Sequence, residues 1–353
     1  GDRERTMSPA QRGGKGSGGS KRTPKARGGA SAAKGAPKRK PMSAAAKKAV
    51  EAKRQRHAAA SVRKADRPGA TARAARGGGD RPVPRGQSAP RGLGGDQVEG
   101  RQAVRELLLA GKRKVREILV AEEQDDNEIL LDIIDLAQDL KVPVREVTRT
   151  RLHAQARTEA PQGVVARAAE LEEHDLETLA RRRTRTGDQP FLLALDGVTD
   201  PGNLGALLRS AECAGVSGIV LPKHRAVHIT PTVTKSAAGA IEYLPMALVG
   251  GLPNALTKLR DMGVWVVGLD MGGSTELFDL AVAEQPVCLV MGAEGKGLSR
   301  LVRERCDAIA SIPLLGELAS LNVSAAGVLA CYEVTRQRLA GRVTVEFDSE
   351  GFD

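Results

Sequence analysis

Residues 191–209 read FLLALDGVTDPGNLGALLR, and this stretch decides the fold class. It opens with 191–196, a short apolar run that is typical of a strand buried on both faces. A turn rich in Asp, Gly and Pro follows, and the apolar spacing of a helix comes after it. The order of strand, turn and helix predicts one unit of a parallel sheet with helices on both faces.

The same texture continues downstream of this stretch. Short runs rich in Val, Ile and Leu predict strands at 218–221, 264–269, 287–291 and 308–312. Helical spacing predicts helices between and after them, at 204–214, 232–240, 254–262, 298–305 and 322–339. We therefore expect a parallel-sheet α/β domain over 191–341, ending at Gly341, and an acidic tail at 342–353 that frays.

A smaller unit precedes this domain. Between residues 96 and 172, helical and strand patterns alternate, which predicts a small α/β/α domain. Its helices are expected at 98–111, 127–140 and 149–157, and its strands at 115–120, 142–147 and 163–169. The polar residues 173–190 are expected to form a helix and a linker between the two domains.

Charge divides the 353-residue chain into two regimes. Residues 1–95 contain 25 Lys and Arg but only 5 Asp and Glu, a net charge of +20, whereas residues 96–353 have a net charge of −9. The first segment is rich in Gly, Ala, Pro and Ser and has almost no large apolar side chains, so we expect a disordered basic arm. Such an arm either raises affinity for RNA by releasing counterions or serves as a solubilising extension.

The composition argues against several classes of protein. No apolar run approaches the roughly 18–20 residues of a transmembrane helix, and the N-terminal residues lack the apolar stretch of a secretory signal. The four cysteines lack metal-ligand spacing, so we expect no metal and read them as buried apolar residues in a reducing cytoplasm: Cys213, Cys288, Cys306 and Cys331. Aromatic residues are 2% of the chain, which disfavours an RNA-binding sheet built on stacking.

In a parallel sheet, ligands bind beyond the carboxyl ends of the strands, and three loops there have unusual composition. In the first loop, Asn203 is expected to cap a helix, and Arg209 lies six residues further on. Because the N-terminus of a helix attracts phosphate, Arg209 is a candidate clamp for an RNA phosphate or a ribose oxygen. The alternative is an ordinary surface arginine on an amphipathic helix.

The second and third loops are weaker signals when each is taken alone. MGAEGKGLS at 291–299 has three glycines in six residues, so it is either a plain turn or a close backbone approach to a cofactor. It matches neither the P-loop nor the Gly-x-Gly-x-x-Gly pattern. IPLLGELASLNVS at 312–324 offers Ser320 or Asn322 as the cap of the last helix, and simple capping is its ordinary interpretation.

Taken together and in this order, the three loops resemble the three motifs of the SpoU/TrmH family. This family comprises S-adenosylmethionine-dependent RNA ribose 2′-O-methyltransferases. The resemblance covers residues 191 to about 339, and 96–170 resembles the substrate-binding domain of members that act on ribosomal RNA. The basic arm departs from the compact form of the family.

The resemblance implies a trefoil-knotted sheet, a homodimer, and a guanosine of 23S rRNA as the target. It implies five catalytic positions, which are Asn203, Arg209, Glu294, Ser320 and Asn322. It also implies main-chain contacts from Gly292, Ile312 and Leu321 to S-adenosylmethionine, with the strand end at Leu269 nearby.

The chemistry that this family performs requires a proton to leave the ribose 2′-hydroxyl. A guanidinium stays protonated, so we expect Arg209 to bind the adjacent phosphate and stabilise alkoxide charge, with that phosphate as a candidate proton acceptor. No histidine stands at a matching position. Two alternatives stay open: a tRNA methyltransferase of the same fold, and a non-catalytic RNA-binding factor in ribosome assembly. The missing dinucleotide fingerprint excludes an oxidoreductase of that class.

Overall fold

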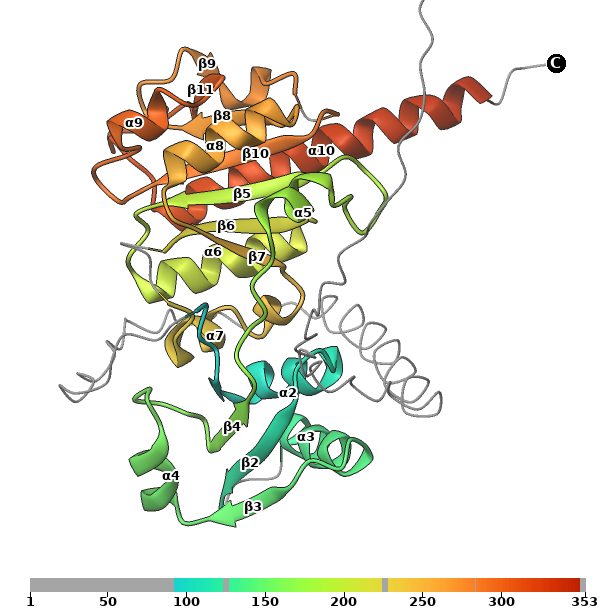
Figure 1. Ribbon diagram of the computed structural model, residues 1–353, viewed down its shortest axis with the longest axis vertical. Helices are drawn as coiled ribbons and strands as arrows, with labels where there is room; N and C mark the ends of the chain where they lie inside the picture. Colours follow the sequence, from blue (N-terminus) through green and yellow to red (C-terminus); the bar gives the residue numbers. More distant parts are fainter. Residues whose placement is uncertain (1–91, 123–126, 224–227, 283, 350–353) are drawn as a thin grey trace, which may run out of the picture. The chain divides into compact units, whose positions relative to one another are not determined.

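The computed structural model describes residues 92–122, 127–223, 228–282 and 284–349. Within these ranges, the larger domain contains one seven-stranded sheet in which every pairing is parallel (Figure 1). The spatial order is β7-β6-β5-β10-β8-β11-β9. The strands are β5 (Phe191–Asp196), β6 (Gly218–Pro222), β7 (Met246–Val249), β8 (Trp265–Leu269), β9 (Thr275–Glu276), β10 (Val287–Gly292) and β11 (Ala308–Ser311). The predicted parallel α/β class is confirmed.

Helices cover both faces of this sheet, as Figure 1 shows. Successive side chains of β5 point to opposite faces, so that Leu193 joins one core cluster and Leu192 the other. The Leu193 side is covered by α6 (Pro201–Cys213), α7 (Pro231–Ser236), the 3-10 turns η1 (Ala240–Glu242) and η2 (Leu277–Asp279), and α10 (Val323–Ser349). The Leu192 side is covered by α5 (Leu176–Arg181), α8 (Leu252–Asp261) and α9 (Arg300–Arg303).

The smaller domain has a sheet of order β1-β4-β2-β3. Its strands are β1 (Gln97–Glu99), β2 (Val115–Ala121), β3 (Val144–Val147) and β4 (Val164–Ala168). The helices α2 (Arg101–Ala110) and α3 (Glu128–Asp139) pack on one face, and α4 (Arg149–Gln155) packs on the other. Layers of helix, sheet and helix follow from the two central strands, β2 and β4, which present apolar residues to both faces.

Several predicted boundaries were wrong. The helix expected from Val98 begins at Arg101, because residues 97–99 pair with β4 and Gly100 turns the chain at a φ of 95°. Strands β7 and β9 were not predicted, since short edge strands carry little periodic signal. The last helix continues through Gly341 to Ser349, since a single glycine destabilises a helix by only about 1 kcal/mol.

The basic arm ends earlier than the sequence indicated. Leu93 is buried, and the backbone of Gly95 donates to the carbonyl of Ile229 (2.9 Å), whose own N–H donates to Leu93. Residues 92–95 therefore belong to the fold. The rest of the predicted arm, residues 1–91, lies outside the described part of the chain.

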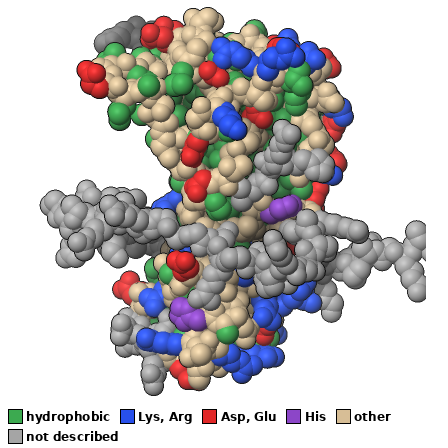
Figure 2. Space-filling model, turned by 90° about the vertical axis from the view of Figure 1, so that its left-hand side faces the viewer, with side chains coloured by type: hydrophobic (Ala, Val, Ile, Leu, Met, Phe, Trp, Pro, Cys, Tyr) green, Lys and Arg blue, Asp and Glu red, His purple; other side chains and the backbone are tan. Residues whose placement is uncertain are grey.

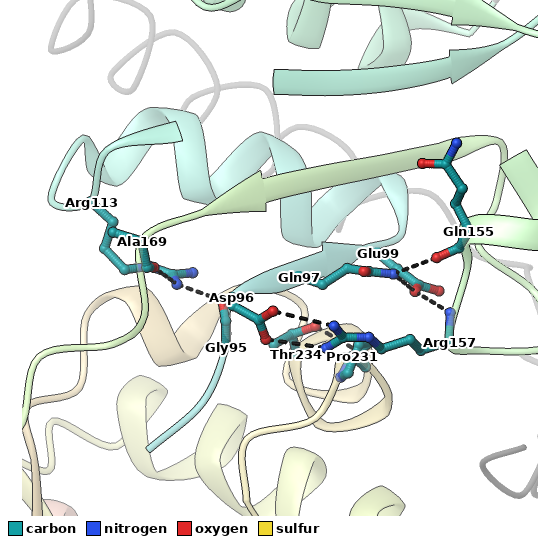
Figure 3. Close-up of polar contacts among 10 residues, drawn as sticks. All are labelled: Gly95, Asp96, Gln97, Glu99, Arg113, Gln155, Arg157, Ala169, Pro231 and Thr234. Atoms are coloured by element: carbon teal, nitrogen blue, oxygen red, sulfur yellow. Dashed lines mark hydrogen bonds and ion pairs between the residues drawn. The ribbon is translucent and has the colours of Figure 1, made fainter. Parts of the chain in front are cut away.

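Arg113 ties the two domains together. One of its Nη atoms donates to the carbonyls of Gly95 (2.6 Å) and Ala169 (2.7 Å), where the chain enters and leaves the small domain (Figure 3). Its Nε and other Nη donate to the carboxylate of Glu242 at 2.9 and 2.5 Å. Both side chains are almost completely buried, so each charge depends on the other for its stability.

Three of the four cysteines fit the expectation of packing residues, and one does not. Cys288 and Cys331 are buried and Cys306 is half-buried, whereas Cys213 is exposed at the end of α6. Burial raises the pKa of Cys306 and Cys331 to about 12, which keeps both thiols protonated and unreactive. In the described residues, no helix has the length and apolar character needed to cross a membrane.

Candidate active site

The three loops converge on one end of the sheet. β5 and β10 lie side by side in register, with Asp196 opposite Gly292, so the loops that follow them leave the sheet together. These loops lead into α6 and α9. The chain after β11 returns to the same place through Asn322, which precedes α10 and hydrogen-bonds to α6.

Asn203 joins the three loops, and the prediction that it caps a helix was wrong. The N-cap of α6 is Asp200, whose carboxylate accepts from the N–H of Asn203 (2.7 Å). Asn203 is therefore inside the helix, and its amide is available for other partners. Its Nδ2 donates to Oε1 of Glu294, and its Oδ1 accepts from Nδ2 of Asn322 (3.0 Å). One amide thus bridges a carboxylate on the second loop and an amide on the third.

Asn322, one of the two residues predicted as a possible cap, does cap α10. Its Oδ1 accepts from the N–H groups of Ser324 (2.9 Å) and Ala325 (3.3 Å), and from the Ser324 hydroxyl (2.5 Å). The sequence motif contained Ser324, but no role was assigned to it; its position two residues after a cap was the available signal. Ser320 is exposed and makes no hydrogen bond to another described residue.

Arg209 does not join this network. It lies six residues beyond Asn203 on α6, about 9 Å further along the helix axis. Its side chain is exposed and makes no hydrogen bond or ion pair with the described residues. A guanidinium that forms no ion pair within the described part of the chain is suited to an anion that arrives from outside, such as a phosphate.

The glycine-rich loop is closed on itself. The backbones of Ala293 and Gly297 exchange two hydrogen bonds, of 3.0 and 2.9 Å. A Cβ at Gly292 would lie 2.2 Å from the carbonyl carbon of Gly297, and Gly297 has a φ of +62°, so neither position accepts a side chain without movement. The loop therefore presents Glu294 at an exposed tip and Gly292 at its buried base.

Three of the four expected donor-binding positions lie at adjacent strand ends. Leu269 ends β8 and pairs with Met291 of β10 and Ala310 of β11. Gly292 is the last residue of β10, and Ile312 directly follows β11. Leu321 is 43% exposed and precedes Asn322. Backbone groups at strand ends, with the exposed leucines of the 312–322 loop, suit a nucleoside with a polar edge and an apolar face. No described His, Cys, Asp or Glu residues form a metal-binding group.

Comparison with known proteins agrees with this arrangement. The "SpoU rRNA Methylase family" matches residues 190–332, and "RNA 2'-O ribose methyltransferase substrate binding" matches residues 97–174. A 23S rRNA (guanosine-2′-O-)-methyltransferase, RlmB, from Shewanella oneidensis is 44% identical over 215 residues, 60% of this chain and 85% of that protein. The chain belongs to the SpoU family. The family interpretation of the three loops is thereby confirmed.

Other SpoU-family proteins extend the comparison. A putative TrmH family tRNA/rRNA methyltransferase, YacO, from Bacillus subtilis is 42% identical over 206 residues, 58% of this chain and 82% of that protein. Among solved structures, the SpoU methyltransferase AviRb from Streptomyces viridochromogenes, in complex with the cofactor AdoMet, aligns with a TM-score of 0.58 and 26% identity. The alignment covers 69% of this chain and 90% of AviRb.

Proposed function

We propose that this SpoU-family enzyme transfers a methyl group from S-adenosylmethionine to a ribose 2′-hydroxyl in RNA, at a guanosine of 23S rRNA. The observation that carries this proposal is the amide of Asn203, which joins Glu294 and Asn322 at the carboxyl ends of the strands. A structural cap needs no such bridge, because Asp200 already caps α6.

The chain's own residues supply orientation and charge. The side-chain amides of Asn203 and Asn322 are hydrogen-bonded to each other. In this proposal, they replace that hydrogen bond with hydrogen bonds to the ribose hydroxyls and so orient the ribose. Glu294 fixes the amide of Asn203 in one rotamer. Arg209 binds the phosphate next to the reactive ribose and stabilises negative charge on the 2′-oxygen. Gly292, Ile312 and Leu321 would hold S-adenosylmethionine, with Leu269 nearby. When bound, the cofactor would supply an electrophilic methyl group and leave as S-adenosylhomocysteine, and the adjacent RNA phosphate would accept the proton of the 2′-hydroxyl.

The choice of ribosomal RNA rests on the small domain. Residues 97–174 match a substrate-binding domain, and the RlmB relative is named for 23S rRNA. A tRNA substrate is the second candidate, because YacO is named for both classes of RNA. A non-catalytic assembly factor is disfavoured, since the polar network of Asn203, Glu294 and Asn322 is complete. Ribosomal RNA as substrate would place the reaction in the cytoplasm.

Charge on the small domain favours one face for RNA. Among the described residues, exposed arginines gather on and beside α4, and Figure 2 shows blue side chains on this side of the small domain. They are Arg145, Arg149, Arg151, Arg157 and Arg167. The opposite layer, α3, carries Glu128, Asp132, Asp135 and Asp139. RNA phosphates would be attracted to the α4 side and repelled from the α3 side.

The family resemblance also carries three proposals on architecture. In this proposal, residues 96–172 bind RNA and residues 191–341 carry the catalytic site. The chain after β11 would form a trefoil knot, which rests on the family resemblance alone. Arg338 of α10 donates to the carbonyls of Gln189 (2.9 Å) and Gln285 (3.1 Å), so this helix packs beside the starts of β5 and β10. The enzyme acts as a homodimer through α10, which exposes a stripe of Ala325, Leu329, Tyr332, Arg336 and Leu339 at alternating spacings of four and three.

The test is methyl transfer from labelled S-adenosylmethionine to RNA isolated from cells that lack this protein. Label in one guanosine of 23S rRNA, resistant to alkaline cleavage at the 3′ side, supports the proposal. Label in tRNA alone supports the second candidate. No label in any RNA, with donor bound, contradicts both.

A further inference from the structure

The loop that leaves the central strand β10 is held from both of its neighbours. Asp196, the last residue of β5, accepts from the N–H of Ser299 through Oδ2 (2.7 Å). Asp270, the first residue after β8, accepts from the N–H of Leu298 through Oδ2 (3.3 Å). Because β10 lies between β5 and β8, the end of the glycine-rich loop is fastened on two sides.

Asp270 is the more elaborate of these two anchors. Its Oδ1 accepts from the N–H of Gly272 (3.2 Å) and pairs with Nη1 of Arg303 (3.1 Å). Arg303 also donates through Nη2 to the carbonyl of Gly272 (2.8 Å). Helix α9, which carries Arg303, is thus tied to the loop that follows β8, and Figure 1 shows α9 beside this end of the sheet.

The carboxylate of Asp270 also fits against the glycine-rich loop. A Cβ at Gly297 would lie 2.7 Å from Oδ2 of Asp270, so the oxygen occupies the space that a side chain would need. Partial burial raises the pKa of Asp270, but the N–H groups of Gly272 and Leu298 and the Arg303 guanidinium outweigh it and hold the pKa below the usual 3.8. The carboxylate is therefore ionised throughout the neutral range.

We propose that Asp270 and Arg303 are positioning residues for methyl-donor binding, acting through the glycine-rich loop. Both oxygens of Asp270 are engaged by groups of this chain, so its effect reaches the donor through the backbone of Gly292–Leu298. The glycine-rich loop also carries Glu294, but the RNA-binding face proposed on the small domain is not part of this loop. Loss of the pair should therefore weaken donor binding and leave RNA affinity unchanged. This inference rests on the proposed function.

The experiment compares D270N, R303M and the double variant with the wild type. Binding of S-adenosylhomocysteine is measured by calorimetry, and KM for S-adenosylmethionine and for RNA is measured separately. We expect each single variant to weaken donor binding by about tenfold or more, since small misplacements at a binding site have effects of this size. The losses should be less than additive in the double variant, because the ion pair between Asp270 and Arg303 is common to both single variants. R303K should recover part of the affinity by restoring charge.

The matched control is Arg300→Ala on the same helix. Arg300 forms an exposed i,i+4 pair with Glu304, and its removal should change no constant by more than about twofold. Donor affinity of D270N and R303M within twofold of the wild type overturns the inference, as does a loss shared equally by donor and RNA. A lower melting temperature with unchanged donor affinity also overturns it. Wild-type protein that binds no donor contradicts the proposed function instead.

Discussion

A single amide organises the candidate site at the residue scale. Asparagine is both donor and acceptor, and Asn203 uses both functions at once, toward Glu294 and Asn322. Aspartate at this position would repel Glu294, and leucine would remove the hydrogen bonds to the Glu294 carboxylate and to Nδ2 of Asn322. The identity of the side chain is therefore dictated by the two loops that contact it.

Replacing Arg209 with alanine should lower kcat by about a hundredfold or more, because one charged contact in the transition state is lost. Donor affinity and the melting temperature should stay unchanged, since the side chain is exposed and unpaired among the described residues. Single-turnover methyl transfer measures the effect. R209K is the control, and it should retain part of the rate because it keeps the charge without the planar fork. Activity of R209A within a few-fold of the wild type removes Arg209 from the mechanism.

Asn322 allows stability and function to be separated. Asn322→Ser keeps a side-chain oxygen that can cap α10, whereas Asn322→Ala does not. We expect the alanine variant to be less stable than the serine variant by about 1 kcal/mol, as measured by denaturant unfolding. Both variants should lose turnover, because neither has an amide for Asn203. A serine variant with full activity would show that Asn322 acts only as a cap.

At the scale of elements, the parallel sheet decides where chemistry takes place. β10 is the central strand, so its carboxyl end is flanked by the ends of β5 and β8. The loop that follows β10 therefore has a neighbouring loop on each side. The 3-10 turn η1 connects this sheet to the small domain, because its Glu242 accepts a hydrogen bond from Arg113. The interface is polar and buried, which makes it sensitive to the loss of one partner.

Glu242→Ala should destabilise the protein by about 3–5 kcal/mol, because it leaves the Arg113 guanidinium buried and unpaired. The double variant Arg113→Met with Glu242→Leu replaces the buried ion pair with two apolar side chains, and it should recover much of this loss. Tyr243→Phe, which removes one hydrogen bond to Glu106 (2.8 Å), should have an effect of about 1 kcal/mol and serves as the control. Urea unfolding of the three variants measures these differences. Equal stability of Glu242→Ala and the wild type would contradict a buried clamp.

At the scale of the whole molecule, charge is divided between a basic N-terminal segment and an acidic remainder. We expect a segment with a net charge of +20 to neutralise RNA phosphates without reading sequence, and the folded part to supply the geometry that does. The contributions of the basic segment and of the folded part to RNA affinity can be separated by varying the salt concentration, because only the contribution of the basic segment depends steeply on it.

Deleting residues 1–91, and keeping 92–95 with the fold, should weaken RNA affinity and flatten its dependence on salt concentration. Turnover at saturating RNA should change little, since no described residue of the site is removed. Filter binding between about 50 and 200 mM salt measures the slope. An unchanged slope would show that the arm does not bind RNA.

The exposed stripe of α10 predicts self-association. Residues 92–353 should sediment as a dimer at micromolar concentration, and Leu329→Arg with Tyr332→Glu should yield monomers, because an isologous interface places each charge twice. Arg336→Glu, at the polar end of the stripe, should weaken the dimer less. A monomer that still methylates RNA at the full rate would contradict both the dimer and any site shared between subunits.

The sequence by itself determined the fold class, both layered domains and the three loops of the site. These are local properties: apolar period, turn residues and caps act over a few neighbouring residues, so a short window contains them. The limits of α2, the strands β7 and β9, and the true end of α10 were not predicted, because edge pairing and packing decide them.

Only the tertiary structure decided which residues meet. Asn203 is 91 residues from Glu294 and 119 from Asn322, and Arg113 is 129 residues from Glu242. The two anchors of the glycine-rich loop, Asp196 and Asp270, lie at the ends of the strands on either side of β10. No local pattern specifies such pairs, because the order of strands in the sheet, and not the order of residues in the chain, brings them within hydrogen-bonding distance.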